Sequence, residues 1–179
     1  QPGTINPATG KATYGYVTEA IDACLAKQVD AVATSPANKE AMRSAGVPHP
    51  GHTEIFAERS KAERFCMMLT SDLLTCSFVT VHVGYHEVPA LLSVERIVDV
   101  IELTRDAMKR IRGREPKLVV CGLNPHAGEH GLFGQSEEER FISPAICRDE
   151  GEKVMCSTND ALHSEKSNTV YRWKHRHFS

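Results

Sequence analysis

The most informative absences in this sequence of 179 residues concern charge and long apolar runs. Its 21 basic and 23 acidic residues leave a net charge of −2, so the sequence provides no basic surface for a nucleic acid. No apolar run approaches the length of a bilayer span, and the first residues lack the charged and apolar regions of a signal peptide. We therefore expect a soluble, cytoplasmic protein that binds neither a membrane nor a nucleic acid.

Several short motifs are also missing. None of the six cysteines belongs to a Cys-x-x-Cys pair, so buried free thiols are a better expectation than disulfides or a cysteine-held zinc site. No Gly-x-Gly-x-x-Gly motif occurs, so the residues give no support for a Rossmann-type dinucleotide site. The dipeptides typical of tight hairpins are absent as well.

The residues that are present alternate between helical and extended patterns. With 41% hydrophobic residues the chain can bury one sizeable core. Two helices are predicted over residues 17–25 and 93–112, and two more are predicted to begin at residues 39 and 136. Strands are predicted over residues 29–34, 65–70, 77–83 and 118–121. Residues 1–14 have a loop-like composition. Strands that alternate with helices favour an α/β fold with a largely parallel sheet.

The predicted strand at residues 118–121 runs into a cluster of Gly, Asn and Pro that ends in His126. The carboxyl ends of strands are where open α/β sheets bind ligands. Pro125 fixes its own φ and restrains Asn124, so the imidazole of His126 leaves the strand tip in a defined direction. His82 stands in a similar place, at the end of the predicted strand 77–83.

His52 and Thr53 follow a Pro-Gly turn, where Thr53 is a candidate N-cap and His52 is either a site residue or a surface histidine. His52, His82 and His126 could form a functional site, or they could be structural histidines. The residues alone make these two interpretations about equally expected. Lys39, at a predicted loop-to-helix junction, is more readily a solvated lysine than a ligand for a phosphate or carboxylate.

The last residues break the pattern. From about Val154 the periodicity vanishes, and residues 171–178 are basic and aromatic. Such a run could be a nucleic-acid patch, but an unstructured or foreign end is the better expectation. We therefore divide the chain into an α/β fragment at residues 1–153 and an anomalous tail at residues 154–179, disordered or translated out of frame.

Five motifs occur in the order that is typical of one enzyme family. They are residues 34–40 (TSPANKE), 51–54 (GHTE), 81–82 (VH), 122–129 (GLNPHAGE) and 133–134 (FG) with the acidic pair that follows. Together they cover roughly residues 14–151 and resemble the 4-hydroxythreonine-4-phosphate dehydrogenase family of vitamin B6 biosynthesis.

The resemblance implies an α/β/α sandwich like that of isocitrate and isopropylmalate dehydrogenases, here incomplete. It also implies a homodimer with active sites at the subunit interface, NAD as the hydride acceptor, and a divalent metal (Zn, Mg or Co) held by three histidines. By position, His82 and His126 match two metal ligands, and His52 and Thr53 match residues that contact the phosphorylated substrate.

This chemistry suits these residue types, because a metal on neutral imidazoles acts as a Lewis acid on the alcohol oxygen during oxidation and the following decarboxylation. Asn124 and Glu129 are candidates for orienting His126.

The chain also departs from the family pattern. The glycine- and proline-rich motif after the family's first strand is absent, as is the later Tyr-His-Asp-Gln-Gly motif that carries the third metal histidine; His163, His175 and His177 stand in no matching context. We therefore expect a fragment that is inactive by itself, or an inactive remnant. A family member acting on another hydroxy acid, such as a threonate or erythronate phosphate or a cyclic dihydrodiol, also fits the motifs.

Overall fold

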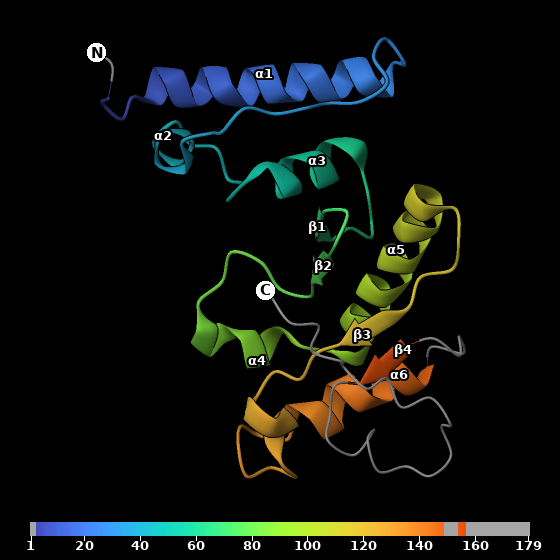
Figure 1. Cartoon of the computed structure of the whole chain (residues 1–179). Helices are drawn as coiled ribbons and strands as arrows, with labels where there is room; N and C mark the ends of the chain where they lie inside the picture. The colour runs from blue at the N-terminus through green and yellow to red at the C-terminus, as the bar shows by residue number, and fades with distance from the viewer. Residues whose placement is uncertain (1–2, 149–153, 157–179) are drawn as a thin grey trace, which may run out of the picture. The chain divides into compact units, whose positions relative to one another are not determined.

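The computed structural model describes residues 3–148 and 154–156. It divides the chain into two compact units, Gln1–Gly84 and Tyr85–Ser179. Figure 1 shows that each unit combines helices with short strands. No helix among the described residues is long and apolar enough to cross a membrane.

Unit 1 begins with the helix α1, Pro7–Leu25. The side chain of Asn6 accepts a hydrogen bond of 2.8 Å from the amide of Ala8, and Pro7 occupies the first helical position, where its missing N–H is not needed. The prediction of a loop is therefore wrong for residues 7–14, because the Asn-Pro pair begins a helix here, while the described residues 3–6 are not helical.

Two shorter helices pack on α1. They are α2, Lys39–Ser44, and α3, His52–Ser60. The helix predicted to open at Lys39 is confirmed, with the side chain of Asn38 accepting from the amide of Ala41 at 2.8 Å. The core of unit 1 joins all three helices through the buried side chains of Val17, Ile21, Met42 and Ile55.

The strands of unit 1 differ from those predicted. Residues 29–34 are described and form no strand. β1 (Met67–Thr70) and β2 (Thr75–Phe78) pair antiparallel as a hairpin. The turn is closed by Ser71, whose amide donates to the carbonyl of Leu74 and whose hydroxyl accepts from the Leu74 amide at 3.1 Å. A serine turn of this kind carries none of the usual hairpin dipeptides, so the sequence did not reveal it.

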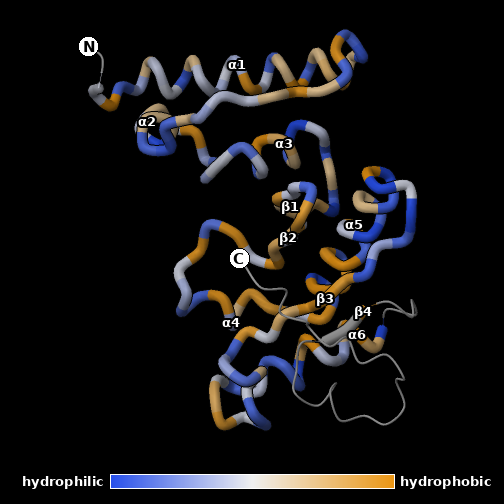
Figure 2. The backbone as a smooth tube through the Cα atoms, viewed as in Figure 1, coloured by the Kyte–Doolittle hydropathy of each residue, from blue (hydrophilic) through white to orange (hydrophobic). Residues whose placement is uncertain are grey.

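The main helix of unit 2 is α5, Val94–Arg112. It follows a 3₁₀ turn at Tyr85–Glu87 (η1) and the short helix α4, Val88–Leu91. Ser93 caps α5 by accepting from the amide of Arg96 at 3.1 Å, and Gly113 ends it with a φ of +65°. Hydrophobic residues recur along α5 in Figure 2, and the prediction of a helix over residues 93–112 is confirmed.

The rest of unit 2 is built around a short parallel pair. β3 (Leu118–Val120) pairs with β4 (Val154–Cys156), with Leu118 opposite Val154. In the sequence, β3 and β4 are separated by the 3₁₀ segment η2 (Pro125–Gly128), the π-helix η3 (Glu138–Ile142) and α6 (Ser143–Arg148). The predicted strand at 118–121 and the helical segment after residue 136 are thus confirmed.

The mixture of helices and strands is confirmed, but the largely parallel sheet is not what the described residues form. They form two separate two-stranded sheets, one antiparallel and one parallel. Val154 opens β4, although the anomalous tail was expected to begin there. Residues 157–179, with His163, His175 and His177, lie outside the described residues.

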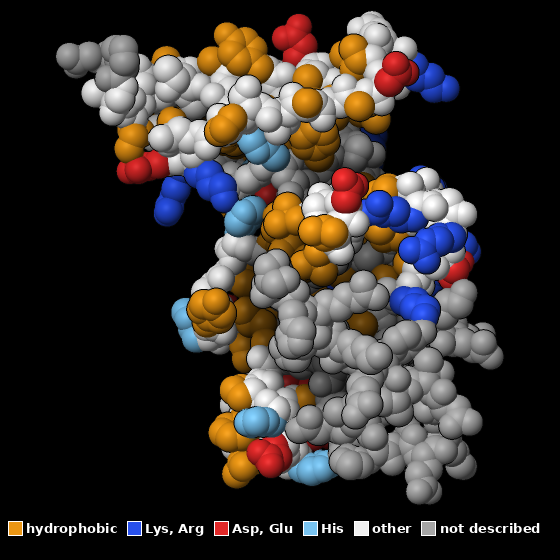
Figure 3. Space-filling model, viewed as in Figure 1, with side chains coloured by type: hydrophobic (Ala, Val, Ile, Leu, Met, Phe, Trp, Pro, Cys, Tyr) orange, Lys and Arg blue, Asp and Glu red, His pale blue; other side chains and the backbone are white. Residues whose placement is uncertain are grey.

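The cysteines whose side chains are described carry free thiols. Cys76, Cys121 and Cys147 are exposed, so the expectation of buried thiols is wrong for these three. Hydrophobic side chains also reach the surface (Figure 3), and Leu73 in the hairpin turn is 98% exposed.

Candidate functional site

The first turn of α3 carries two of the predicted site residues. The N-cap is Gly51, in an extended conformation with φ −169° and without a side-chain cap. The helix therefore begins at His52, with Thr53 as its second residue. The prediction that Thr53 is the N-cap is wrong, because the helix begins two residues earlier than that prediction requires.

His82 lies against this same turn. Its Nδ1 is 3.5 Å from Oε1 of Glu54. A Cβ atom at Gly51 would lie 3.2 Å from Cε1 of His82, so a larger residue there would require the ring to shift by a few tenths of an ångström. His82 itself adopts a left-handed φ of +59°, and it follows β2 by four residues, because that strand ends at Phe78. The histidine predicted at a strand tip thus lies in a loop that brings it to α3.

Two polar atoms of this turn are buried and have no hydrogen-bond partner. They are Nε2 of His52 and Oε2 of Glu54. Leaving such an atom unsatisfied costs about 1–3 kcal/mol, so an unpaired buried atom calls for an explanation, such as a bound polar group. The structure thus brings together His52, Glu54 and His82 within unit 1, with two buried polar atoms that lack a hydrogen-bond partner.

A groove of about 750 Å³ extends from His82 along unit 1. Its lining includes the cationic side chains of Lys39 and Arg43, together with Glu40, Val47, Pro48, His49 and Pro50. His49 is already engaged, since its Nε2 lies 2.5 Å from Oε2 of Glu58. Lys39, the first residue of α2, is exposed and supplies positive charge to this groove.

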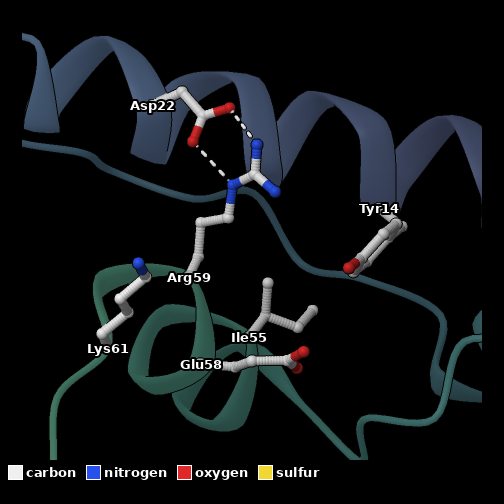
Figure 4. A pocket seen from close by; sticks show the side chains of 6 residues that line it. All are labelled: Tyr14, Asp22, Ile55, Glu58, Arg59 and Lys61. Atoms are coloured by element: carbon white, nitrogen blue, oxygen red, sulfur yellow. Dashed lines mark hydrogen bonds and ion pairs between the residues drawn. The ribbon is translucent and has the colours of Figure 1, made fainter.

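A second pocket, of about 360 Å³, lies between α1 and α3. Figure 4 shows Arg59 reaching from α3 to the carboxylate of Asp22 on α1. Both carboxylate oxygens accept from the guanidinium, one at 2.6 Å from Nε. The Arg59 hydrogen bonds lower the pKa of Asp22 and raise the pKa of Arg59. This pair fastens the helix that carries His52 to α1.

In unit 2, His126 occupies a strained position beyond the tip of β3. His126 and Ala127 have φ values of +52° and +51°, a region that non-glycine residues rarely adopt. The imidazole is exposed and its centroid lies 6.1 Å from the ring of Phe133. Glu129, predicted to orient His126, is exposed and also has a left-handed φ, of +43°.

The side chain of Asn124, also predicted to orient His126, is bound to two buried carboxylates. Its Nδ2 donates to Oε2 of Glu137 at 3.0 Å and to Oε2 of Glu138 at 3.2 Å. Oε1 of Glu138 accepts from the backbone amide of Asn124 at 2.8 Å. Glu137 and Glu138 are only 3% and 2% exposed, so together they clamp the turn that precedes His126.

The sequence showed the acidic pair at Glu137 and Glu138 as part of the fifth motif, but it did not predict what these side chains contact. The structure directs both side chains at the turn after β3. A Cβ at Gly128 would lie 2.6 Å from Oε2 of Glu138, so this glycine is required for the clamp. The amide of Gln135, which donates to Glu137 at 2.7 Å, lowers the pKa of Glu137.

The donor chemistry around His82 fits a divalent metal. A carboxylate beside one ring nitrogen is a usual feature of a metal-binding histidine. Within residues 3–148 and 154–156, no three His, Cys, Asp or Glu side chains form a group that could hold a metal. His82 belongs to unit 1 and His126 belongs to unit 2.

The family model for the pyridoxal phosphate biosynthetic protein PdxA matches residues 1–163. The chain belongs to the PdxA family. The resemblance inferred from the five motifs is thereby confirmed, and the His52 turn and the His126 turn are parts of a PdxA-family chain.

Similar proteins of the PdxA family carry dehydrogenase names. A 4-hydroxythreonine-4-phosphate dehydrogenase of Desulfosudis oleivorans is 46% identical over 145 residues, which cover 80% of this chain and 43% of the relative. A D-threonate 4-phosphate dehydrogenase of Pectobacterium atrosepticum is 37% identical over 146 residues, which cover 82% of this chain and 44% of the relative. The chain thus spans less than half the length of these curated PdxA relatives.

A solved structure of a similar protein has a matching fold. The crystal structure of a 4-hydroxythreonine-4-phosphate dehydrogenase from Klebsiella pneumoniae has a TM-score of 0.73 and 35% sequence identity, and the match covers 86% of this chain and 47% of that one. The PdxA-family chain therefore shares its backbone arrangement with part of that enzyme.

Proposed function

We propose that this chain is part of an NAD-dependent, divalent-metal-assisted dehydrogenase that oxidises 4-phosphohydroxy-L-threonine, with decarboxylation, in pyridoxal phosphate biosynthesis. The PdxA family match supports the reaction class. The observation that carries the proposal is the position of His82 against the first turn of α3, where Nε2 of His52 is buried and unpartnered.

The proposed metal ligands in this chain are His82 and His126. When bound, a divalent metal such as Zn, Mg or Co supplies a Lewis acid for the alcohol oxygen, and NAD accepts the hydride. The protein would contribute the ring nitrogens of these two imidazoles to the metal. Nδ1 of His82 lies 3.5 Å from Oε1 of Glu54, and the backbone amide of Asn124, in the turn before His126, donates to Glu138.

The substrate is proposed to lie along α3 and the groove beside it. His52 and Thr53 would donate hydrogen bonds to substrate oxygens, which would satisfy the buried nitrogen of His52. Lys39 and Arg43 line the groove and would attract the phosphate group. We further propose that the complete enzyme has the α/β/α sandwich of isocitrate dehydrogenase-like enzymes and acts as a cytoplasmic homodimer.

A second substrate is favoured by a specific observation. The relative from Pectobacterium atrosepticum is named as a D-threonate 4-phosphate dehydrogenase and is 37% identical to this chain. D-Threonate 4-phosphate also combines a hydroxy acid with a phosphate, so the same groove and histidines would suit it.

A chimera tests the function and the substrate together. We suggest replacing the matching 145-residue segment of the Desulfosudis oleivorans relative by that of this chain and measuring NADH formation with both phosphates. We expect turnover of 4-phosphohydroxy-L-threonine, a roughly 10-fold higher KM in His52→Ala from the loss of one hydrogen bond, and almost no kcat in His82→Ala.

The control is His86→Ala, because His86 is an exposed histidine outside the proposed site. A chimera that is active only on D-threonate 4-phosphate would reassign the substrate. Full activity in the His82→Ala chimera would show that the proposed metal site is wrong.

A further inference from the structure

We propose that Glu54 is a positioning residue for His82, which holds the proton of the imidazole on Nδ1 and leaves the lone pair of Nε2 for a metal. The identity of the group bound at Nε2 rests on the proposed function. The position of the proton rests only on the contact between Glu54 and His82.

The contact joins two half-buried side chains. Oε1 of Glu54 lies 3.5 Å from Nδ1 of His82, and the side chains of His82 and Glu54 are 31% and 22% exposed. Partial burial limits the water that would otherwise compete for Nδ1. At this distance the attraction is mainly electrostatic, and it favours the tautomer whose proton is on Nδ1, the ring nitrogen beside the carboxylate.

The side chains of His82 and Glu54 both lie close to the backbone of Gly51. A Cβ at this position would lie 3.2 Å from Cε1 of His82 and 3.3 Å from Oε2 of Glu54. The ring and the carboxylate therefore both pack against the N-cap of α3. In this arrangement Nδ1 is the ring nitrogen that lies beside Glu54.

The hydrogen-bonding capacity of the two groups then determines which tautomer is favoured. A neutral imidazole has one N–H and one bare nitrogen, whereas an ionised carboxylate only accepts hydrogen bonds. The favourable arrangement puts the N–H on Nδ1, toward Glu54, so Nε2 is the bare nitrogen. Removing the carboxylate removes this preference, and the proton moves toward Nε2, where it blocks a metal.

The tautomer can be measured without any enzyme activity. We suggest long-range ¹H–¹⁵N correlation spectra of the full chain with ¹⁵N-labelled histidine, at a pH of about 8. The His82 signals are assigned by their loss in His82→Asn. We expect the Nδ1–H form to predominate at His82.

Three variants sharpen the measurement. Glu54→Leu removes the acceptor and is expected to shift His82 toward the Nε2–H form, while Glu54→Gln, which keeps a weaker acceptor, is expected to lie between. Glu58→Gln is the matched control, since Glu58 lies on the same helix but pairs with His49. A predominant Nε2–H form in the unaltered chain overturns the proposal, as does an unchanged tautomer in a folded Glu54→Leu chain.

Zinc titration separates this inference from the proposed function. We expect Zn²⁺ to shift the Nε2 resonance of His82, with an affinity about 10-fold lower in Glu54→Leu, as for other residues that orient metal ligands. An Nδ1–H tautomer that depends on Glu54 but shows no response to Zn²⁺ would support the positioning role and contradict the metal site.

Discussion

Glu137 gives the chain a pH dependence at the scale of a single residue. Its carboxylate accepts from the amide of Gln135 at 2.7 Å, and this bond lowers the pKa below the ordinary value of 4.5. A carboxyl group with a depressed folded-state pKa stabilises the fold above the unfolded-state pKa, and this contribution is lost as the pH falls through the folded value. We therefore expect Glu137 to favour the folded state at neutral pH and not in acid.

Urea unfolding at pH 6 and at about pH 3 checks this expectation. Replacing Glu137 by Gln removes the titrating group, so the difference in unfolding free energy between the two pH values should shrink. The control is Glu139→Gln, because the side chain of Glu139 is 44% exposed beside His130. An equal pH dependence in the Glu137→Gln and unaltered chains would contradict the assignment.

The residues of the candidate site were predictable only in part from the sequence. His52, Thr53, His82 and His126 stand in recognisable motifs, and their residue types already suggest hydrogen bonding or metal binding. The partners of these residues were not predicted, because Glu54 meets His82 only through a loop 28 positions later. A contact of this kind depends on the path of the backbone, which residue types do not specify.

At the scale of an element, Gly10 determines how closely α2 approaches α1. A Cβ at Gly10 would lie 2.0 Å from the carbonyl oxygen of Ala41, which is backbone and cannot rotate away. Alanine normally stabilises a helix interior by about 0.5–1 kcal/mol relative to glycine. Here we expect the clash to exceed this gain, so that Gly10→Ala destabilises the chain by about 1–3 kcal/mol.

Gly15 is the matched control, since it lies in the same helix and a Cβ there would meet nothing within 4 Å. Gly15→Ala should therefore stabilise the chain by the ordinary helix propensity, and the two variants should move the urea midpoint in opposite directions. Stabilisation by Gly10→Ala would mean that α1 and α2 do not pack this closely.

The helix α5, whose signals are local, was predicted correctly, whereas the strand predicted at residues 29–34 was not found. α5 has a serine cap, a glycine stop and regular apolar spacing, so its bounds followed from the sequence. The strand predicted at residues 29–34 fails among the described residues because an apolar run becomes a strand only beside a partner. The start of α1 was missed because a Pro-rich opening also resembles a loop.

At the scale of the whole molecule, the proposed set of metal ligands determines what activity we expect of this chain. Metal sites in catalysis generally use three protein ligands, whereas the proposal supplies two, His82 and His126. We therefore expect no NADH formation from 4-phosphohydroxy-L-threonine by this chain alone with Zn²⁺, Mg²⁺ or Co²⁺, in a spectrophotometric assay at 340 nm that detects the relative from Desulfosudis oleivorans. Turnover by the chain that disappears in His82→Ala would show that two histidines suffice.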